Sequence, residues 1–264
     1  MQPDPANLLG QIGLTTHPVG LYDAPDATPF EPLVTPTAEV HACVFAFYDD
    51  WIRGRTLHLT KDNFGCRGAG SCLLGVDTRS QEELVTFLVD GEGLKASRQL
   101  MRAWVERRGS YRPEHPNILI GPLRREQFQY LKTVTFFVNP DQLAALSLGA
   151  NYHSGPDDPA PVISSFGSGC SQLVALLGDL ASPKAIIGAT DIAMRQFLPP
   201  DTLAFTVTTP MFQRLCELDE RSFLYKPFLR NLRKAREHAE RPRGGSAAHR
   251  ATRPEPRSRT RPRP

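Results

Sequence analysis

The sequence predicts an α/β or α+β fold, with a mixed sheet and flanking helices in a single globular domain. Short segments of strand character alternate with segments of helical periodicity along most of the chain. At 264 residues, of which 40% are hydrophobic, the chain is long enough to bury a real core. The last part is rich in arginine and proline and contains no large apolar residue, which predicts a disordered tail.

We expect three parts along the chain: a flexible N-terminus over residues 1–17, a globular domain over 18–238 and a disordered, basic tail over 239–264. Charge separates the tail from the rest. From Arg230 onward, twelve Lys and Arg residues stand against three Glu, a net +9, while the rest holds 19 basic and 25 acidic residues, a net −6. Such a tail can make weak, salt-sensitive contact with nucleic acid or another polyanion. The alternative is a solubilising tail without a partner, which the lack of interleaved aromatic residues favours.

The first predicted elements are a short strand, a long helix and a second strand. Residues 18–22 have strand character. A helix is predicted over 36–53, because Thr35 can cap it and Pro36 suits its first turn. Its apolar face would comprise Val40, Cys43, Val44, Phe47 and Trp51. Gly54 ends this helix, and alternation over 55–60 predicts the second strand.

Capping signals organise the middle of the chain. Ser80 and Glu83 form a capping box that predicts a helix beginning there. A second helix is expected over 94–108, followed by strands over 117–121 and 133–138. Asn139 as cap, with Pro140 at the first helical position, then predicts a helix through Leu146.

The last third repeats the order of strand, then helix. Strands are predicted over 162–165, 185–188 and 203–207. Thr209 and Pro210 begin a helix through Cys216, and a final helix carries Phe223, Phe228, Leu229 and Leu232. Residues 135–140 and 205–210 share the order strand, polar cap, proline and helix, which is a weak sign of an internal repeat.

We expect a cytoplasmic protein. Residues 1–5 have neither the basic nor the apolar region of a signal peptide. No segment approaches the roughly 18 continuous apolar residues of a membrane helix. Cytoplasmic thiols stay reduced, and an odd count of five cysteines argues against a disulfide framework. We therefore interpret the cysteines as free thiols or ligands.

Three cysteines occupy positions typical of ligating or reactive thiols. Cys43 lies near the start of a predicted helix, Cys66 in the glycine-rich loop 65–75, and Cys170 directly after the Gly-Ser-Gly of residues 167–169. With Cys72 as a candidate fourth metal ligand, they suit an iron–sulfur cluster, and three thiolates would leave one iron open to a substrate. Zinc fits less well, because the spacing from Cys66 to Cys72 is wider than that of paired zinc ligands. Sulfur atoms more than about 10 Å apart would contradict a shared site.

Our first hypothesis is therefore a cysteine-ligated iron–sulfur protein that acts in redox chemistry or binds a small substrate. The alternative is a metal-free small-molecule-binding or accessory module, in which the thiols are small buried hydrophobes. A third hypothesis makes Cys170 a catalytic thiol, with its pKa lowered by a helix dipole and with His153 or His41 as base. The glycine-rich loop could also hold a phosphate, although it lacks the Gly-Lys-Ser/Thr ending of a P-loop.

Six short motifs in a fixed order connect the sequence to a known family. They are Cys43, Asp62–Cys66, Leu74–Gly75, Phe137–Gln142, Asn151–Gly155 and Gly169–Cys170. Through them, residues 18–218 resemble domain-of-unknown-function family 169, also called the archaeal conserved region family. The resemblance implies that Cys43, Cys66 and Cys170 are family-type cysteines and that the basic tail is an addition to the family pattern. It implies no mechanism, because the family has no assigned biochemical role.

Overall fold

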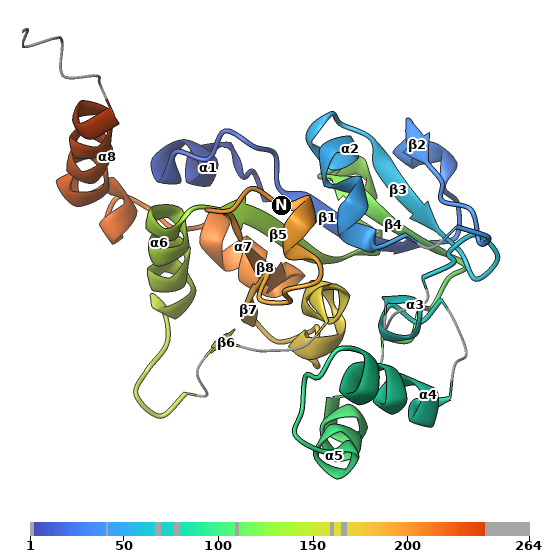
Figure 1. Cartoon of the computed structure of the whole chain (residues 1–264). Helices are drawn as coiled ribbons and strands as arrows, with labels where there is room; N and C mark the ends of the chain where they lie inside the picture. Colours follow the sequence, from blue (N-terminus) through green and yellow to red (C-terminus); the bar gives the residue numbers. More distant parts are fainter. Residues whose placement is uncertain are drawn as a thin grey trace, which may run out of the picture. The chain divides into compact units, whose positions relative to one another are not determined.

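The computed structural model describes residues 3–40, 42–66, 70–76, 80–108, 111–158, 161–164 and 168–240. The chain divides into two units, Met1–Lys226 and Pro227–Pro264. In the first unit, the described strands form one eight-stranded sheet in the order β2-β3-β4-β1-β5-β8-β7-β6 (Figure 1). The strands are β1 Val19–Ala24, β2 Leu33–Val34, β3 Thr56–Leu59, β4 Asn117–Pro122, β5 Leu131–Val138, β6 Val162–Ser164, β7 Ala185–Gly188 and β8 Leu203–Thr208.

Helices of three kinds accompany the sheet. The α-helices of the first unit are α1 Ala6–Ile12, α2 Tyr48–Ile52, α3 Gly70–Leu73, α4 Gln81–Thr86, α5 Arg98–Arg108, α6 Pro140–Asn151 and α7 Thr209–Cys216. The 3₁₀ helices are η1 Thr28–Phe30, η2 Val44–Phe47, η4 Arg125–Tyr130, η5 Gly169–Leu173, η6 Ala175–Leu177, η7 Arg195–Phe197 and η8 Phe223–Tyr225. One π-helical turn, η3, spans Phe87–Gly91.

The sheet is mixed, as the sequence predicts. Strand β2 runs parallel to β3, and β6 runs parallel to β7, while the other neighbouring strands pair antiparallel. The two strands of the suggested internal repeat, β5 and β8, are neighbours in the sheet, with Phe136 opposite Phe205. Strand β1 is buried along its whole length. A central strand that is buried on both sides requires cover on both faces of the sheet.

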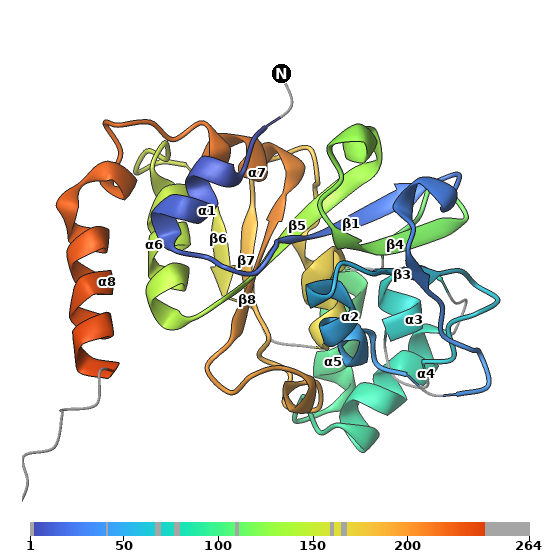
Figure 2. The same ribbon diagram turned by 90° about the horizontal axis from the view of Figure 1, so that it is seen from above.

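The two faces of the sheet carry different layers (Figure 2). Helices α1, α6 and α7 pack together on one face, where the Phe136 ring of β5 lies 6.2 Å from the Phe212 ring of α7. Side chains alternate along a strand, so the next residue, Phe137, points to the opposite face. There it stacks on Trp51 of α2, with ring centroids 5.9 Å apart. This second face, with α2, η2 and η5, carries the cysteine segments.

The predicted capping signals work as expected. The Ser80 hydroxyl accepts from the Glu83 N–H and the Glu83 carboxylate accepts from the Ser80 N–H, which begins α4. Asn139 and Gln142 make the same reciprocal pair at the start of α6. Helix α5 begins at Arg98 rather than at Leu94, because Ser97 caps it by accepting from the Leu100 N–H.

The helix predicted over 36–53 is wrong in its first half. Of the described residues in this range, only 44–52 are helical, as η2 followed by α2, and Val40 is 62% exposed. The reason is a tertiary contact. A Cβ added at Gly65 would lie 2.0 Å from the carbonyl oxygen of Ala38, so the backbone near Ala38 packs against the cysteine loop. Cys43 is extended and precedes η2 as its N-cap residue.

The two ends of the chain also differ from expectation. Residues 1–17, predicted to be flexible, contain α1, with Leu8 and Ile12 buried, and Gln142 Nε2 donates to the Gly13 carbonyl at 2.9 Å. The second unit contains α8, Pro227–Glu240, which runs beyond the predicted domain end at 238. The rest of the predicted tail, 241–264, lies outside the described residues. None of the described helices combines the length and apolar composition needed to span a membrane.

Candidate functional site

Cys43, Cys66 and Cys170 line one cavity of about 390 Å³. They come from three separate segments: Cys43 precedes η2, Cys66 comes shortly before α3, and Cys170 lies in η5. The other walls are mainly apolar and include Phe45, Phe87, Met194 and Phe197. The polar lining residues are Glu92, Ser168, Asp191 and Gln196. The structure thus brings together the three thiols that the sequence singled out.

Gly70 shows how closely two of the sulfur atoms approach. A Cβ added at Gly70 would lie 3.1 Å from Sγ of Cys66 and 3.5 Å from Sγ of Cys170. Both sulfur atoms therefore face the space that a side chain at position 70 would occupy. The two lie well within the 10 Å limit that a shared site requires. Glycine at the start of α3 keeps this space open.

Burial controls the ionisation of the thiols. Desolvation, with smaller contributions from the neighbouring Cys66 and Asp191, raises the pKa of Cys43 to about 11. Desolvation also raises the pKa of Cys170 well above its ordinary value, with Cys66, Cys43 and Asp191 adding to the effect. Without a compensating cation, both thiols are protonated at neutral pH. A bound metal ion would reverse this, because ligand thiols bind metal as thiolates.

The expectation that a helix dipole lowers the pKa of Cys170 is wrong. Cys170 is the second residue of the short 3₁₀ helix η5, and it is buried. Loss of hydration therefore outweighs the backbone hydrogen bond that favours the thiolate. Of the two proposed bases, His153 lines a different depression, together with Asp158, Lys184 and Arg214. The other, His41, lies outside the described residues.

Asp191 fixes the loop that carries Cys170. Its carboxylate accepts from the Gly169 N–H at 2.8 Å and from the Ala193 N–H at 2.9 Å. Asp191 is nearly buried, so these charge-assisted hydrogen bonds are shielded from water. The carboxylate thereby joins the start of η5 to the segment that supplies Met194 and Phe197 to the cavity wall.

Two polar atoms at the cavity lack hydrogen-bond partners. They are Oε2 of Glu92 and Oγ of Ser168, a residue that is only 5% exposed. Burial raises the pKa of Glu92 to about 7, and the charge of Asp191 adds to this shift. Glu92 directly follows the π-helical turn η3, a conformation that is frequent at functional sites. Buried polar groups without partners are unusual in folded proteins, and two of those found in the described residues belong to the lining of this cavity.

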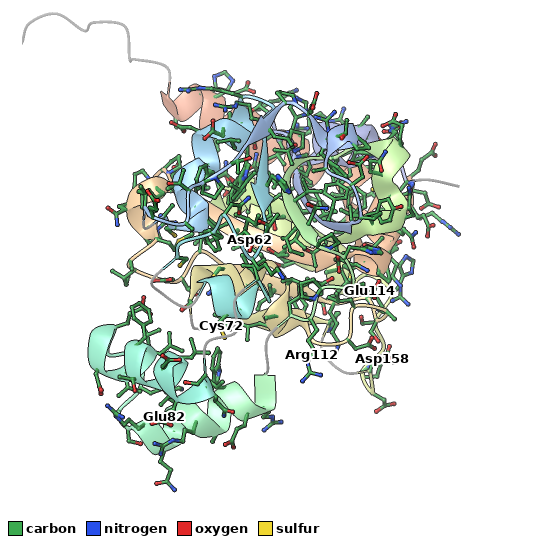
Figure 3. All side chains as sticks on the ribbon, turned by 90° about the vertical axis from the view of Figure 1, so that its right-hand side faces the viewer. Asp62, Cys72, Glu82, Arg112, Glu114 and Asp158 are labelled. Atoms are coloured by element: carbon green, nitrogen blue, oxygen red, sulfur yellow. The ribbon has the colours of Figure 1, made fainter. Side chains whose placement is uncertain are left out.

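The remaining two cysteines lie elsewhere. Cys72, the candidate fourth ligand, is buried on α3 but is not among the described residues that line the cavity. Figure 3 shows it between the sheet layer and the α4–α5 pair that carries Glu82. Cys216 lies on α7, where desolvation raises its pKa to about 12. Within the described ranges, no group of three or more His, Cys, Asp and Glu side chains is already arranged to hold a metal ion.

The family model of the uncharacterised ArCR proteins, domain of unknown function 169, matches residues 7–218. The chain belongs to this family. The match agrees with the resemblance seen in the sequence and begins inside α1, which makes the N-terminal helix part of the ArCR domain. Helix α8 and the basic tail lie beyond the match. No curated protein and no solved structure matched the chain.

Sequence reasoning missed two residues of the ArCR cavity, Glu92 and Asp191. Glu92 stands in the sequence Asp-Gly-Glu-Gly, which is typical of a solvated turn. Asp191 precedes Ile192 and gives no periodic signal. The only signal in the sequence is that Glu92 and Asp191 each lie close to an apolar segment. That signal does not indicate that the two carboxyls lie in the same cavity as the thiols.

Proposed function

We propose that this ArCR protein binds an iron–sulfur cluster through Cys43, Cys66 and Cys170, in a reducing compartment such as the cytoplasm. The observation that supports the proposal is the convergence of three thiols from three separate segments on one cavity. Clusters with several irons take their thiolates around a volume. A single tetrahedral zinc ion instead needs all its sulfur ligands about 2.3 Å from one point. Thiols spaced around a cavity therefore favour the cluster.

The surroundings of the thiols fit such a group. The missing side chain of Gly70 leaves room between Cys66 and Cys170. Cluster irons would stabilise the thiolates, which burial otherwise disfavours in Cys43 and Cys170. Three protein ligands leave one iron of a four-iron cluster without a protein ligand, and that iron could exchange electrons or bind a small molecule. Asp191 and the backbone N–H groups around η5 would position the Cys170 segment.

The test is anaerobic purification of the full chain, with an absorbance spectrum and analysis of iron and acid-labile sulfide. The wild type should contain both, with a broad absorbance near about 400 nm. Cys43→Ala, Cys66→Ala and Cys170→Ala should each lose most of the iron. Cys72→Ala is the matched control, since it removes a thiol that is also buried but does not line the cavity. Cys216→Ala is a second control, on the other face of the sheet.

Two outcomes would reject the proposal. A wild-type protein that holds neither iron nor sulfide after anaerobic purification and reconstitution has no cluster. Equal iron loss in Cys72→Ala and Cys66→Ala, with both proteins folded by circular dichroism, would mean that the cavity thiols have no special role.

One observation favours a second candidate, a metal-free small-molecule-binding module. The cavity lies within the usual size range of ligand pockets, roughly 300–1,000 Å³, and its lining includes Glu92 and Ser168, each with a buried oxygen that lacks a partner. A protein of this kind would be colourless, its thiols would all react with an alkylating agent after unfolding, and it would tolerate Cys→Ser changes. The metal analysis above separates the two candidates.

A further inference from the structure

We infer that the cavity takes a small molecule with a cationic amine at one end, held beside Glu92, and an apolar body packed against the phenylalanine rings. This inference rests on the proposed function in that the amine would occupy the same cavity as the cluster thiols, and it names the class of molecule that binds there. Hydrogen bonding, charge and the shape of the walls point to it independently.

Hydrogen bonding provides the first argument. Oε2 of Glu92 and Oγ of Ser168 are buried without partners, and both residues line the cavity. A buried acceptor without a donor lowers stability, so a ligand that donates hydrogen bonds would recover free energy once these side chains turn toward it. An ammonium group offers three N–H donors and no acceptor, which suits a carboxylate and a hydroxyl oxygen.

The charges of the cavity provide the second argument. The described lining residues include the carboxyls of Glu92 and Asp191, but no Lys, Arg or His. Asp191 already accepts two backbone N–H groups, so it contributes negative charge while Glu92 keeps a spare oxygen. Cluster thiolates would add further negative charge. These carboxyls would repel an anionic ligand and attract a cation.

The apolar walls provide the third argument. Phe45, Phe87 and Phe197 line the same cavity, and Met194 lies with them. Aromatic rings bury the apolar part of a ligand, and their faces also attract cations. A cavity of about 390 Å³ is at the small end of ligand pockets, which indicates a compact molecule rather than a polymer or a dinucleotide.

The test compares amines with carboxylates of the same skeleton. Binding to the full chain is measured by calorimetry for butylamine, benzylamine and phenethylamine, and for pentanoate, phenylacetate and 3-phenylpropionate. At least one amine should bind at least ten times more tightly than its matched carboxylate. Glu92→Gln, which keeps the size of the side chain, should weaken that amine by tenfold or more. Glu82→Gln is the control, because Glu82 is exposed and pairs with Arg102.

The inference is overturned if no amine binds at millimolar concentration, if the carboxylates bind as well, or if Glu92→Gln and Glu82→Gln have equal affinities. The titrations are run on anaerobically purified protein and on chelator-treated, metal-free protein. If the anaerobically purified and reconstituted protein holds no iron but shows amine selectivity that depends on Glu92, the cluster is rejected and the amine site is kept. Iron that depends on the cavity thiols, without amine selectivity, would do the reverse.

Discussion

Two carboxyl groups of the ArCR domain, Asp23 and Glu92, lie in opposite situations. Asp23 on β1 is fully buried, yet its oxygens accept from the Tyr111 hydroxyl and from the N–H groups of Glu114 and His115, at 2.7–2.8 Å. Glu92 is only half-buried, and its Oε2 has no partner. Asp23 thus stabilises the fold through its hydrogen bonds, while Glu92, a residue of the cavity lining, keeps a buried oxygen without a partner.

The largest expected effect comes from removing the carboxylate of Asp23, which has hydrogen-bond partners. Asp23→Ala leaves the Tyr111 hydroxyl and two backbone N–H groups without their acceptor. We expect a loss of about 3 kcal/mol in the free energy of unfolding, the scale of hydrogen bonds to a buried charge. Urea unfolding followed by circular dichroism measures it. A loss below about 1 kcal/mol would show that the Asp23 cluster is not a major support of the fold.

Two glycines of the cysteine segment give the next largest effect. Gly65→Ala would place a Cβ against the Ala38 carbonyl, a backbone atom that cannot turn away, so we expect a loss of about 1–3 kcal/mol. Gly70→Ala meets the sulfur atoms of Cys66 and Cys170, which can turn, and a ring carbon of Phe64 at 3.5 Å, an ordinary contact distance. It should lower the stability by less than about 1 kcal/mol but at least halve the iron content. Unfolding curves and iron analysis of both variants check this, and intact iron in Gly70→Ala would contradict it.

Glu92 itself gives a smaller, pH-dependent effect. Its pKa is raised from 4.5 to about 7, so between these values the folded protein binds more protons than the unfolded chain. Stability should therefore fall as the pH rises through this range. Glu92→Gln removes that fall. Because Glu92 is only half-buried, the effect is modest. Between pH 4.5 and pH 8, the free energy of unfolding of the variant should rise by about 1 kcal/mol relative to that of the wild type. Thermal unfolding at several pH values tests it, and parallel curves for the two proteins would refute the assignment.

The smallest effect is expected at Ser168. Ser168→Ala removes a buried hydroxyl that has no partner, so stability should stay within about 0.5 kcal/mol of the wild type or rise slightly. Thr135→Ala is the contrasting variant, because the Thr135 hydroxyl shares a 2.9 Å hydrogen bond with Thr206 across β5 and β8. It should lose about 1 kcal/mol. If both variants lose equally, the distinction between satisfied and open polar groups fails.

The sequence predicts most of the sheet but little of the cavity, and the reason is the range of the interactions. Ser80–Glu83 and Asn139–Gln142 are caps made within one helical turn, so their residues alone indicate them. Strands such as β3 and β8 show up in short apolar patterns. The extended chain around Cys43 depends on Ala38 packing against Gly65, and the cavity depends on Asp191 joining two segments. No local pattern records such contacts.

The dispersal of Cys43, Cys66 and Cys170 along the chain has a consequence for how the protein matures. In a zinc finger, closely spaced ligands let the metal organise the chain as it folds. Here Cys66 and Cys170 are separated along the chain by β4 and β5, which pair with β1 and β8. Closing so long a loop is slow, so we expect the sheet to form before the two thiols meet. The polypeptide would therefore fold first, with protonated thiols, and receive any cluster afterwards. Any such cluster would be installed in a finished protein rather than serve as a template for folding.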